Sequence, residues 1–339
     1  MHKKNRIEDI KLSHGSGGVL MHRLVDSVFI KNFDNAILRQ KKDSAIIDIG
    51  GKTLAFTTDS YVVKPIFFPG GDIGSLAVFG TVNDLSVCGA RPLYLSLGLI
   101  IEEGLSGDLL RDIVDSISKA ARVSGVKVVT GDTKVVEKGS CDKIFISTSG
   151  IGEVYYKGLA ADSIEPGDAV IISASIGEHA VSVLSKREGI DFNTKVKSDS
   201  RPLYGMIRDM LKASSGVKFM RDPTRGGLAT TLNEIVKDMP FGIEIREEAV
   251  PVKESVRGAC ELLGFDPMYL ACEGVFVAIV DKKDVKRVLR TIRKDRNGRM
   301  SSQIGVVTGY AKGKVSLKTS SGGQRLMDML TGEQLPRIC

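Results

Sequence analysis

Cysteine and histidine are both scarce in this sequence, and neither is clustered. The five cysteines form no CxxC pair, and the four histidines are scattered along the chain. An odd number of dispersed cysteines disfavours a disulfide framework, and the lack of a Cys/His cluster disfavours a structural zinc site. We therefore expect reduced thiols and no metal centre built on imidazole. The cysteines are Cys88, Cys141, Cys260, Cys272 and Cys339.

Long apolar runs are also missing. No stretch reaches the length of a membrane span, and the basic residues near the start are not followed by the apolar region of a secretory signal. The net charge is +7, but its most basic run, residues 282–299, has no aromatic residue and has the spacing of a solvated helix face. These absences predict a cytoplasmic protein whose partners include neither a membrane nor a nucleic acid.

The chain is long enough for two domains with separate cores, since 42% of its 339 residues are hydrophobic. Strand-like and helix-like segments alternate in both halves, and hairpin-like pairs favour an α+β fold over a parallel doubly wound sheet. One helix is expected between Ser106 as N-cap and Gly125 as its end. The expected divisions are a glycine-rich segment with a helix (1–43), an N-terminal domain (44–155), a C-terminal α+β domain (156–319) and a mobile tail (320–339).

Three acidic motifs mark the candidate site: "TTDS" with Asp59, "VNDL" with Asn83 and Asp84, and "RDPTRGG" with Asp222. We expect each at a junction between elements, where its side chain projects into a cleft. Converging carboxylates need a cation, and hard oxygen ligands suit Mg²⁺ that bridges nucleotide phosphates. The alternative for any one aspartate is a helix N-cap, and Asp222 before Pro223 fits both interpretations.

Two further stretches complement these acids. "VVTGDTK" places Asp132 and Lys134 just past a predicted strand, where lysine could neutralise a phosphate. The loop "HGSGG", residues 14–18, adds flexibility, a hydroxyl and the imidazole of His14, although such a loop before a helix is usually only a turn. No P-loop, dinucleotide-binding fingerprint or kinase motif set is present.

Taken together, these motifs resemble the HypE family of hydrogenase maturation carbamoyl dehydratases. The family belongs to the superfamily of aminoimidazole ribonucleotide synthetase and selenophosphate synthetase. The resemblance spans nearly the whole chain, and the terminal "PRIC" is its most specific element. The motifs that carry it are "HGSGG", "TTDSYVVKPIFFPGGDIG", "GTVNDLSVCGARP", "GDTKVVEKG", "RDPTRGGLATTLNEI" and "PRIC".

The resemblance implies a ferredoxin-like N-terminal domain that pairs with a second copy into a β-barrel, with ATP between the two domains. It also implies that Cys339 is carbamoylated by HypF, dehydrated with ATP to a thiocyanate, and then delivers cyanide to the HypC–HypD complex. Asp59, Asp84 and Asp222 would bind Mg²⁺, and Lys134 would offset phosphoryl charge. The remaining nucleotide-binding residues would be Asn83, Asp132, Thr224, Gly226 and Gly227.

Dehydration also requires a base that removes N–H protons, and the candidates are Lys134, Glu273 of "ACEG" and His14. Three alternatives stand beside this hypothesis. The chain could be a selenophosphate synthetase, although the first 87 residues lack a cysteine, or a thiamine-phosphate kinase-like enzyme. It could also be a non-enzymatic, ATP-responsive binding module whose terminal thiol ligates a metal for a partner. For Cys339 alone, the plainest interpretation is a frayed chain end.

Overall fold

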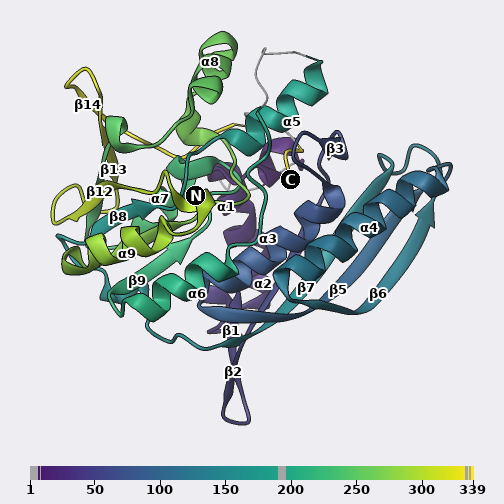
Figure 1. Ribbon diagram of the computed structural model, residues 1–339, viewed down its shortest axis with the longest axis horizontal. Helices are drawn as coiled ribbons and strands as arrows, with labels where there is room; N and C mark the ends of the chain where they lie inside the picture. The colour runs from purple at the N-terminus through teal and green to yellow at the C-terminus, as the bar shows by residue number, and fades with distance from the viewer. Residues whose placement is uncertain (1–6, 8, 190–195, 333–334, 336) are drawn as a thin grey trace.

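A computed structural model of the chain describes residues 7, 9–189, 196–332, 335 and 337–339. Two β-sheets stand side by side, and helices pack against both of them (Figure 1). The chain completes the first sheet at Val154 and begins the second at Ala169. Because both sheets mix antiparallel and parallel pairs, the predicted α+β class is confirmed.

The first sheet has the strand order β1-β2-β7-β5-β6, in which only the β5–β6 pair is parallel. A Gly-Gly turn joins β1 to β2 in an antiparallel hairpin, as the hairpin-like pairs in the sequence indicate. Helices α3 and α4 cover one face of this sheet (Figure 1). The elements are β1 (Ala45–Ile49), β2 (Lys52–Tyr61), α3 (Ile73–Val87), β5 (Ala90–Glu102), α4 (Gly107–Ser124), β6 (Lys127–Val136) and β7 (Ile144–Val154).

Helix α3 is the buried centre of this half. Its Gly80 packs directly on β2, where an added Cβ would lie only 2.3 Å from the Tyr61 hydroxyl oxygen. Helix α4 begins and ends as predicted: the Ser106 hydroxyl accepts a hydrogen bond from the Asp108 N–H, and Gly125 takes a left-handed conformation at the C-terminus. The close α3–β2 contact fixes the spacing of the acidic residues that these two elements carry.

The second sheet has the order β14-β13-β10-β12-β8-β11-β9. Helix α7 packs on one face through Leu228 and Leu232, and α6 and α9 pack on the other through Met210 and Val288. The strands are β8 (Ala169–Ile172), β9 (Val217–Arg221), β10 (Gly242–Arg246), β11 (Val277–Val280), β12 (Ser302–Thr308), β13 (Val315–Lys318) and β14 (Gln324–Leu326). The helices are α5 (Glu178–Glu188), α6 (Tyr204–Ala213), α7 (Gly227–Val236), α8 (Glu254–Leu263) and α9 (Val285–Ile292).

Shorter elements join the two halves. The N-terminal segment forms a nearly continuous helix through α1 (Val19–Leu24), a π-helical stretch (Val25–Ile30) and α2 (Lys31–Phe33). A small hairpin of β3 (Phe67–Phe68) and β4 (Gly71–Asp72) precedes α3. In the part of the chain that the structure describes, no helix is both long and apolar enough to cross a bilayer.

The described residues of the segment expected to be a mobile tail, 320–339, are docked, residues 333, 334 and 336 lie outside the description, and mobility of the tail stays a prediction. Strand β14 pairs with β13, Met327 is fully buried, and Ile338 joins the core of the N-terminal half. The chain end therefore lies against the body, close to α5 and β3 (Figure 1). Local sequence did not reveal these contacts because the partners of the tail lie far away along the chain.

Candidate functional site

The structure brings Asp59, Asp84 and Asp222 together from three elements. Asp59 lies near the end of β2 and Asp84 near the end of α3, whereas Asp222 directly follows β9. The expectation of three junctions is therefore wrong for Asp59 and Asp84, which lie inside regular elements. The side chains still converge, because α3 packs on β2 and contacts β9.

Burial raises the pKa of all three carboxyl groups, and mutual repulsion adds to the shifts of Asp84 and Asp222. Burial, followed by the charges of Asp59 and Asp222, raises the pKa of Asp84 well above its ordinary value. Burial, together with Asp43 and Asp59, raises the pKa of Asp222 to about 8. Thr57 Oγ1 donates to Asp84 Oδ2 at 2.8 Å, and the Tyr61 hydroxyl donates to Asp59 Oδ2 at 3.1 Å. Such crowding of carboxyl groups is relieved by a cation.

These donors fit a magnesium ion in their chemistry, since hard carboxylate oxygens are the ligands it prefers. Within the described residues, however, no group of three or more His, Cys, Asp or Glu side chains is arranged closely enough to hold a metal. The magnesium role of Asp59, Asp84 and Asp222 therefore stays a prediction that rests on their shared burial and repulsion.

Asn83 makes contacts between the two halves, and its role in nucleotide binding stays a prediction. Its amide nitrogen donates to the carbonyl oxygens of Arg201 and Glu273, each at 3.0 Å, and its oxygen accepts from the Leu203 N–H at 2.8 Å. The side chain is fully buried. Asn83 thus joins α3 to the C-terminal half, which leaves one lone pair of its oxygen as its only spare capacity.

Two glycine-rich segments meet beside the acidic residues. A Cβ on Gly17 would lie 2.7 Å from the Arg225 carbonyl oxygen, and one on Gly18 would lie 2.3 Å from that of Leu330. Gly226 and Gly227 both have positive φ and begin α7, with the Gly227 N–H donating to the Thr224 carbonyl at 3.1 Å. The "HGSGG" loop is therefore more than a turn, because its close approach holds both the 222–227 loop and the base of the tail.

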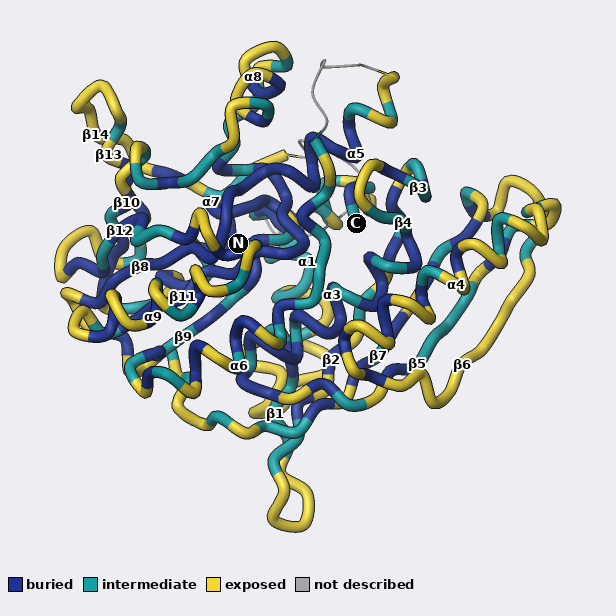
Figure 2. Tube along the Cα trace, in the orientation of Figure 1, coloured by how far each residue is buried: buried dark blue, intermediate teal, exposed yellow. Residues whose placement is uncertain are grey.

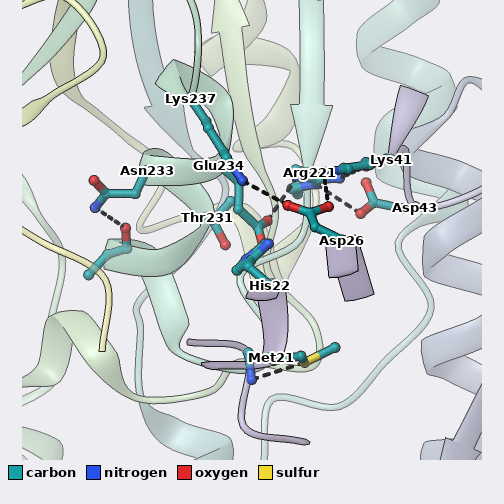
Figure 3. A network of polar contacts seen from close by, with 12 residues as sticks. Met21, His22, Asp26, Lys41, Asp43, Arg221, Thr231, Asn233, Glu234 and Lys237 are labelled. Atoms are coloured by element: carbon teal, nitrogen blue, oxygen red, sulfur yellow. Dashed lines mark hydrogen bonds and ion pairs between the residues drawn. The ribbon is translucent and has the colours of Figure 1, made fainter. Parts of the chain in front are cut away.

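A network of ion pairs fixes the N-terminal segment at this position (Figure 3). Arg221 pairs with Asp43 and with Glu234, both at 2.9 Å, and His22 Nε2 lies 2.9 Å from Glu234. Asp26 pairs with Lys41 from its own segment and with Lys237 beyond α7. The network joins residues 22–43 to β9 and α7. The segment that follows the glycine loop is therefore fixed to the strand that precedes Asp222.

Cys339 lies in the same region. A cavity of about 110 Å³ borders the docked tail. That volume is well below the roughly 300 Å³ at which ligand pockets begin, but it suits a small group carried by the thiol. The residues around the cavity are Gly15, Ser16, Ser60, Val62, Arg225, Gly226, Tyr269, Ala271, Leu330, Leu335, Arg337, Ile338 and Cys339.

Glu273 and Arg225 supply the charge around the terminal thiol. Burial, followed by the charge of Glu273, raises the pKa of Cys339 to about 12, and Arg225 opposes this shift. Glu273 is itself buried, and its Oε1 has no hydrogen-bond partner. Burial and the charges of Asp222, Asp199 and Asp59 raise the pKa of Glu273 well above its ordinary value. An unpartnered buried carboxyl oxygen beside a thiol is a strong candidate for proton transfer.

The remaining predicted residues lie outside this pocket. Lys134 and Asp132 form an exposed ion pair of 2.7 Å on β6, and the Nδ1 of His14 accepts the Lys11 N–H at 2.9 Å. Lys134 does share a cross-strand row with Ile100 and Phe145, and the Phe145 ring contacts Arg337 of the tail. Two strand spacings, roughly 10 Å, separate the backbone of Lys134 from that of Phe145. The base role of His14 and the phosphate role of Lys134 and Asp132 therefore stay predictions.

Three site residues were missed by sequence reasoning. Arg225 stands within "RDPTRGG" but was not singled out, although an arginine beside paired glycines was a usable signal. Asp199 is buried with an unpartnered Oδ2, and its pKa is raised to about 6 by burial. His179 contacts the tail through its Nε2 atom, 2.8 Å from the Ile338 carbonyl oxygen. No sequence motif marks Asp199 or His179, because only tertiary contacts bring each of them to this site.

Two family models match the chain, and both describe AIR synthase related proteins. The N-terminal domain model covers residues 41–154, and the C-terminal domain model covers residues 165–318. The fold and its buried acidic pocket therefore define a protein of the AIR synthase related class.

Individual relatives narrow this class. The carbamoyl dehydratase HypE of Rhizobium leguminosarum bv. viciae is 49% identical, over 97% of this chain and 95% of the relative. A solved HypE–HypF complex is 46% identical with a TM-score of 0.85, and covers 91% of this chain and 99% of its own. A solved HypE complex with ATP is 48% identical with a TM-score of 0.82, and the match covers 98% of this chain and 100% of the solved chain. The chain belongs to the HypE family of carbamoyl dehydratases.

Proposed function

We propose that this chain uses ATP to dehydrate a carbamoyl group carried on its own Cys339, which yields a thiocyanate. The docking of the terminal thiol beside Glu273 and Arg225 carries the proposal, because it brings the thiol to a buried carboxyl group and a cation that the dehydration can use. A solved relative binds ATP and another binds HypF, so we assign ATP as the co-substrate and HypF as the carbamoyl donor.

The carbamoyl oxygen must leave, and oxide is a poor leaving group. ATP, bound with Mg²⁺, supplies the phosphoryl group that turns this oxygen into phosphate, while the two N–H protons depart and a C≡N bond forms. Asp59, Asp84 and Asp222 would hold the cation, and the backbone N–H groups of Thr224 and Gly226 would face the phosphates, while the positive φ of Gly227 shapes the loop. Arg225 lies where its charge would stabilise the developing negative charge.

Glu273 is the favoured proton acceptor among the three candidates. In the free protein its raised pKa favours the protonated carboxyl group, which is the form that cannot accept a proton. Neutralising the charges of Asp59 and Asp222 removes two causes of that shift and lowers the pKa of Glu273. Occupation of the acidic pocket would thus prepare the base at the moment when it is needed.

A homodimer is part of the proposal. Phe56, Ile151 and Tyr94 lie in one cross-strand row on the sheet face opposite α3 and α4, and all three are exposed. Strand β6 is exposed at nearly every residue (Figure 2). Two such faces pressed together would form the β-barrel that the family resemblance implies, and Lys134 would lie at its rim.

Delivery of the cyanide to a HypC–HypD complex would require the tail to leave its pocket.

The test is the mass of the C-terminal peptide. Incubation with HypF, carbamoyl phosphate and ATP should first add a carbamoyl group to that peptide and then remove one water. Carbamoylated protein that has been separated from ATP should keep its carbamoyl group until ATP is added again. If ATP never removes water from the carbamoylated peptide, or if the change occurs on another cysteine such as Cys272, the proposal is wrong.

A further inference from the structure

The last described residues are held by groups that have no part in the dehydration chemistry. The Val62 N–H donates to the Cys339 carbonyl oxygen at 3.1 Å, and the Lys64 N–H donates to the Arg337 carbonyl at 3.2 Å. The tail therefore pairs with the backbone that follows β2, much as an added strand pairs with a sheet edge. The pairing therefore extends to the main chain of Cys339.

Arg337 is recognised through its side chain as well. Its Nη1 lies 2.8 Å from Asp142 Oδ2, and its Nε donates to the Val62 carbonyl at 2.9 Å. The guanidinium carbon lies 5.7 Å from the centre of the Phe145 ring, within range of a cation–π contact. A carboxylate, a carbonyl and a ring face together select a guanidinium at this position.

His179 holds the next residue. It is fully buried, and burial lowers its pKa to about 4, so the imidazole is neutral at physiological pH. Its Nε2 lies 2.8 Å from the Ile338 carbonyl oxygen, which only accepts, so Nε2 carries the proton. The Nδ1 atom then accepts from the Ser198 hydroxyl at 2.8 Å. Arg187 adds a hydrogen bond of 2.7 Å to the Arg337 carbonyl.

We propose that residues 62–64, Asp142, His179 and Arg187 form a tail clamp, a binding site for a segment of the type Arg-Ile-Cys. The proposal rests on the proposed function, for which the clamp presents the loaded thiol to Glu273 and Arg225. No contact of these residues with the thiol is observed, so they are positioning residues and not catalytic ones. The buried imidazole of His179 is the central contact.

The clamp has a consequence that is measured without any partner or nucleotide. A docked Cys339 is half-buried with a raised pKa, whereas a released one is exposed with the ordinary pKa of a thiol. Only the released thiol reacts quickly with an alkylating agent, because the thiolate is the reactive form. The alkylation rate of Cys339, divided by that of a free peptide of the same terminal sequence, therefore gives the released fraction.

The experiment treats the full-length protein with iodoacetamide and follows the C-terminal peptide by mass spectrometry. We expect Cys339 to react at least about tenfold more slowly than the peptide Leu-Pro-Arg-Ile-Cys. His179→Leu removes one hydrogen bond and should accelerate the reaction about three- to tenfold. His179→Gln keeps an N–H donor at the place of Nε2 and should stay near the wild-type rate.

Asp142→Asn provides a second variant at a partly exposed position, should His179→Leu fail to fold. It weakens the pair with Arg337 and should accelerate alkylation by up to about fivefold. Its matched control is Asp209→Asn, which removes the carboxylate partner of Arg208 on α6 and should leave the rate unchanged.

Two results would overturn the clamp: a wild-type Cys339 that reacts as fast as the free peptide, or Leu and Gln variants of His179 with equal rates. Because neither HypF nor ATP is present, these outcomes do not depend on the dehydratase activity. An intact clamp without thiocyanate formation would refute the proposed function alone.

Discussion

Asp222 and the carboxyl groups around it destabilise the free protein as the pH rises. The folded pKa of Asp222 is about 8, far above the ordinary value for aspartate, so the folded state binds more protons than the unfolded one between these values. Stability from this group is present at low pH and is lost as the pH rises towards 8. His179, whose pKa is lowered, acts in the opposite direction, but only below about pH 6.5.

Asp222→Asn should therefore be stabilising in the free protein. Between pH 6.5 and 8 the wild type should lose on the order of 1 kcal/mol relative to the variant. The variant should also lose the stabilisation that Mg²⁺–ATP gives the wild type. Thermal unfolding at both pH values, with and without Mg²⁺–ATP, measures both effects. If the stabilities of the two proteins changed equally with pH, the raised pKa of Asp222 would be contradicted.

Glu273→Gln tests the proton acceptor. Glutamine keeps the shape but cannot accept a proton, so dehydration of the carbamoylated tail should slow by about 10²- to 10⁴-fold. Carbamoylation by HypF and ATP binding should persist. Single-turnover kinetics on the carbamoylated protein measures the rate, and Glu261→Gln on the exposed side of α8 is the control. An unchanged rate would leave the base role to Lys134 or His14.

Glycine 18 provides the test at the level of an element. Alanine there would place a methyl group 2.3 Å from the Leu330 carbonyl oxygen and separate the glycine loop from the base of the tail. We expect a loss of about 1–3 kcal/mol in stability, which is typical of overpacking. Gly15→Ala in the same loop meets nothing within 4 Å and should be neutral. Chemical denaturation measures the free energy of unfolding of both variants. Equal values for Gly18→Ala and Gly15→Ala would contradict the close contact of Gly18 with Leu330.

Elements with strong local signals were predictable from the sequence. The turn at Gly50 and Gly51, the Ser106 cap and the Gly125 end all follow from local chemistry. The candidate site was predictable in its acidic members, because "TTDS", "VNDL" and "RDPTRGG" are short motifs. The docked tail was not predictable, because the pairing of Val62 with Cys339 depends on tertiary contacts that no periodicity encodes.

Two copies pressed face to face would cover the exposed row of Phe56, Ile151 and Tyr94. Ile151→Asp places a charge at the centre of this row and should turn a dimer into a monomer at micromolar concentration, since burying an unpaired charge is very unfavourable. Val114→Asp, on the outer side of α4 and similarly exposed, should remain dimeric. Light scattering distinguishes the two states, and a wild type that is monomeric at that concentration would contradict the dimer.

Leu330 determines how far the tail of the whole molecule can travel. Its carbonyl oxygen accepts the Val19 N–H at 2.9 Å, so the tail is anchored there and only nine residues, 331–339, lie beyond the anchor. Fully extended, they span about 30 Å. The anchor limits the reach of Cys339, so a donor or acceptor enzyme must bring its own active site within that radius of Leu330. The anchor thus limits which face of the molecule partners approach, and a longer segment after Leu330 would allow partners to bind farther away.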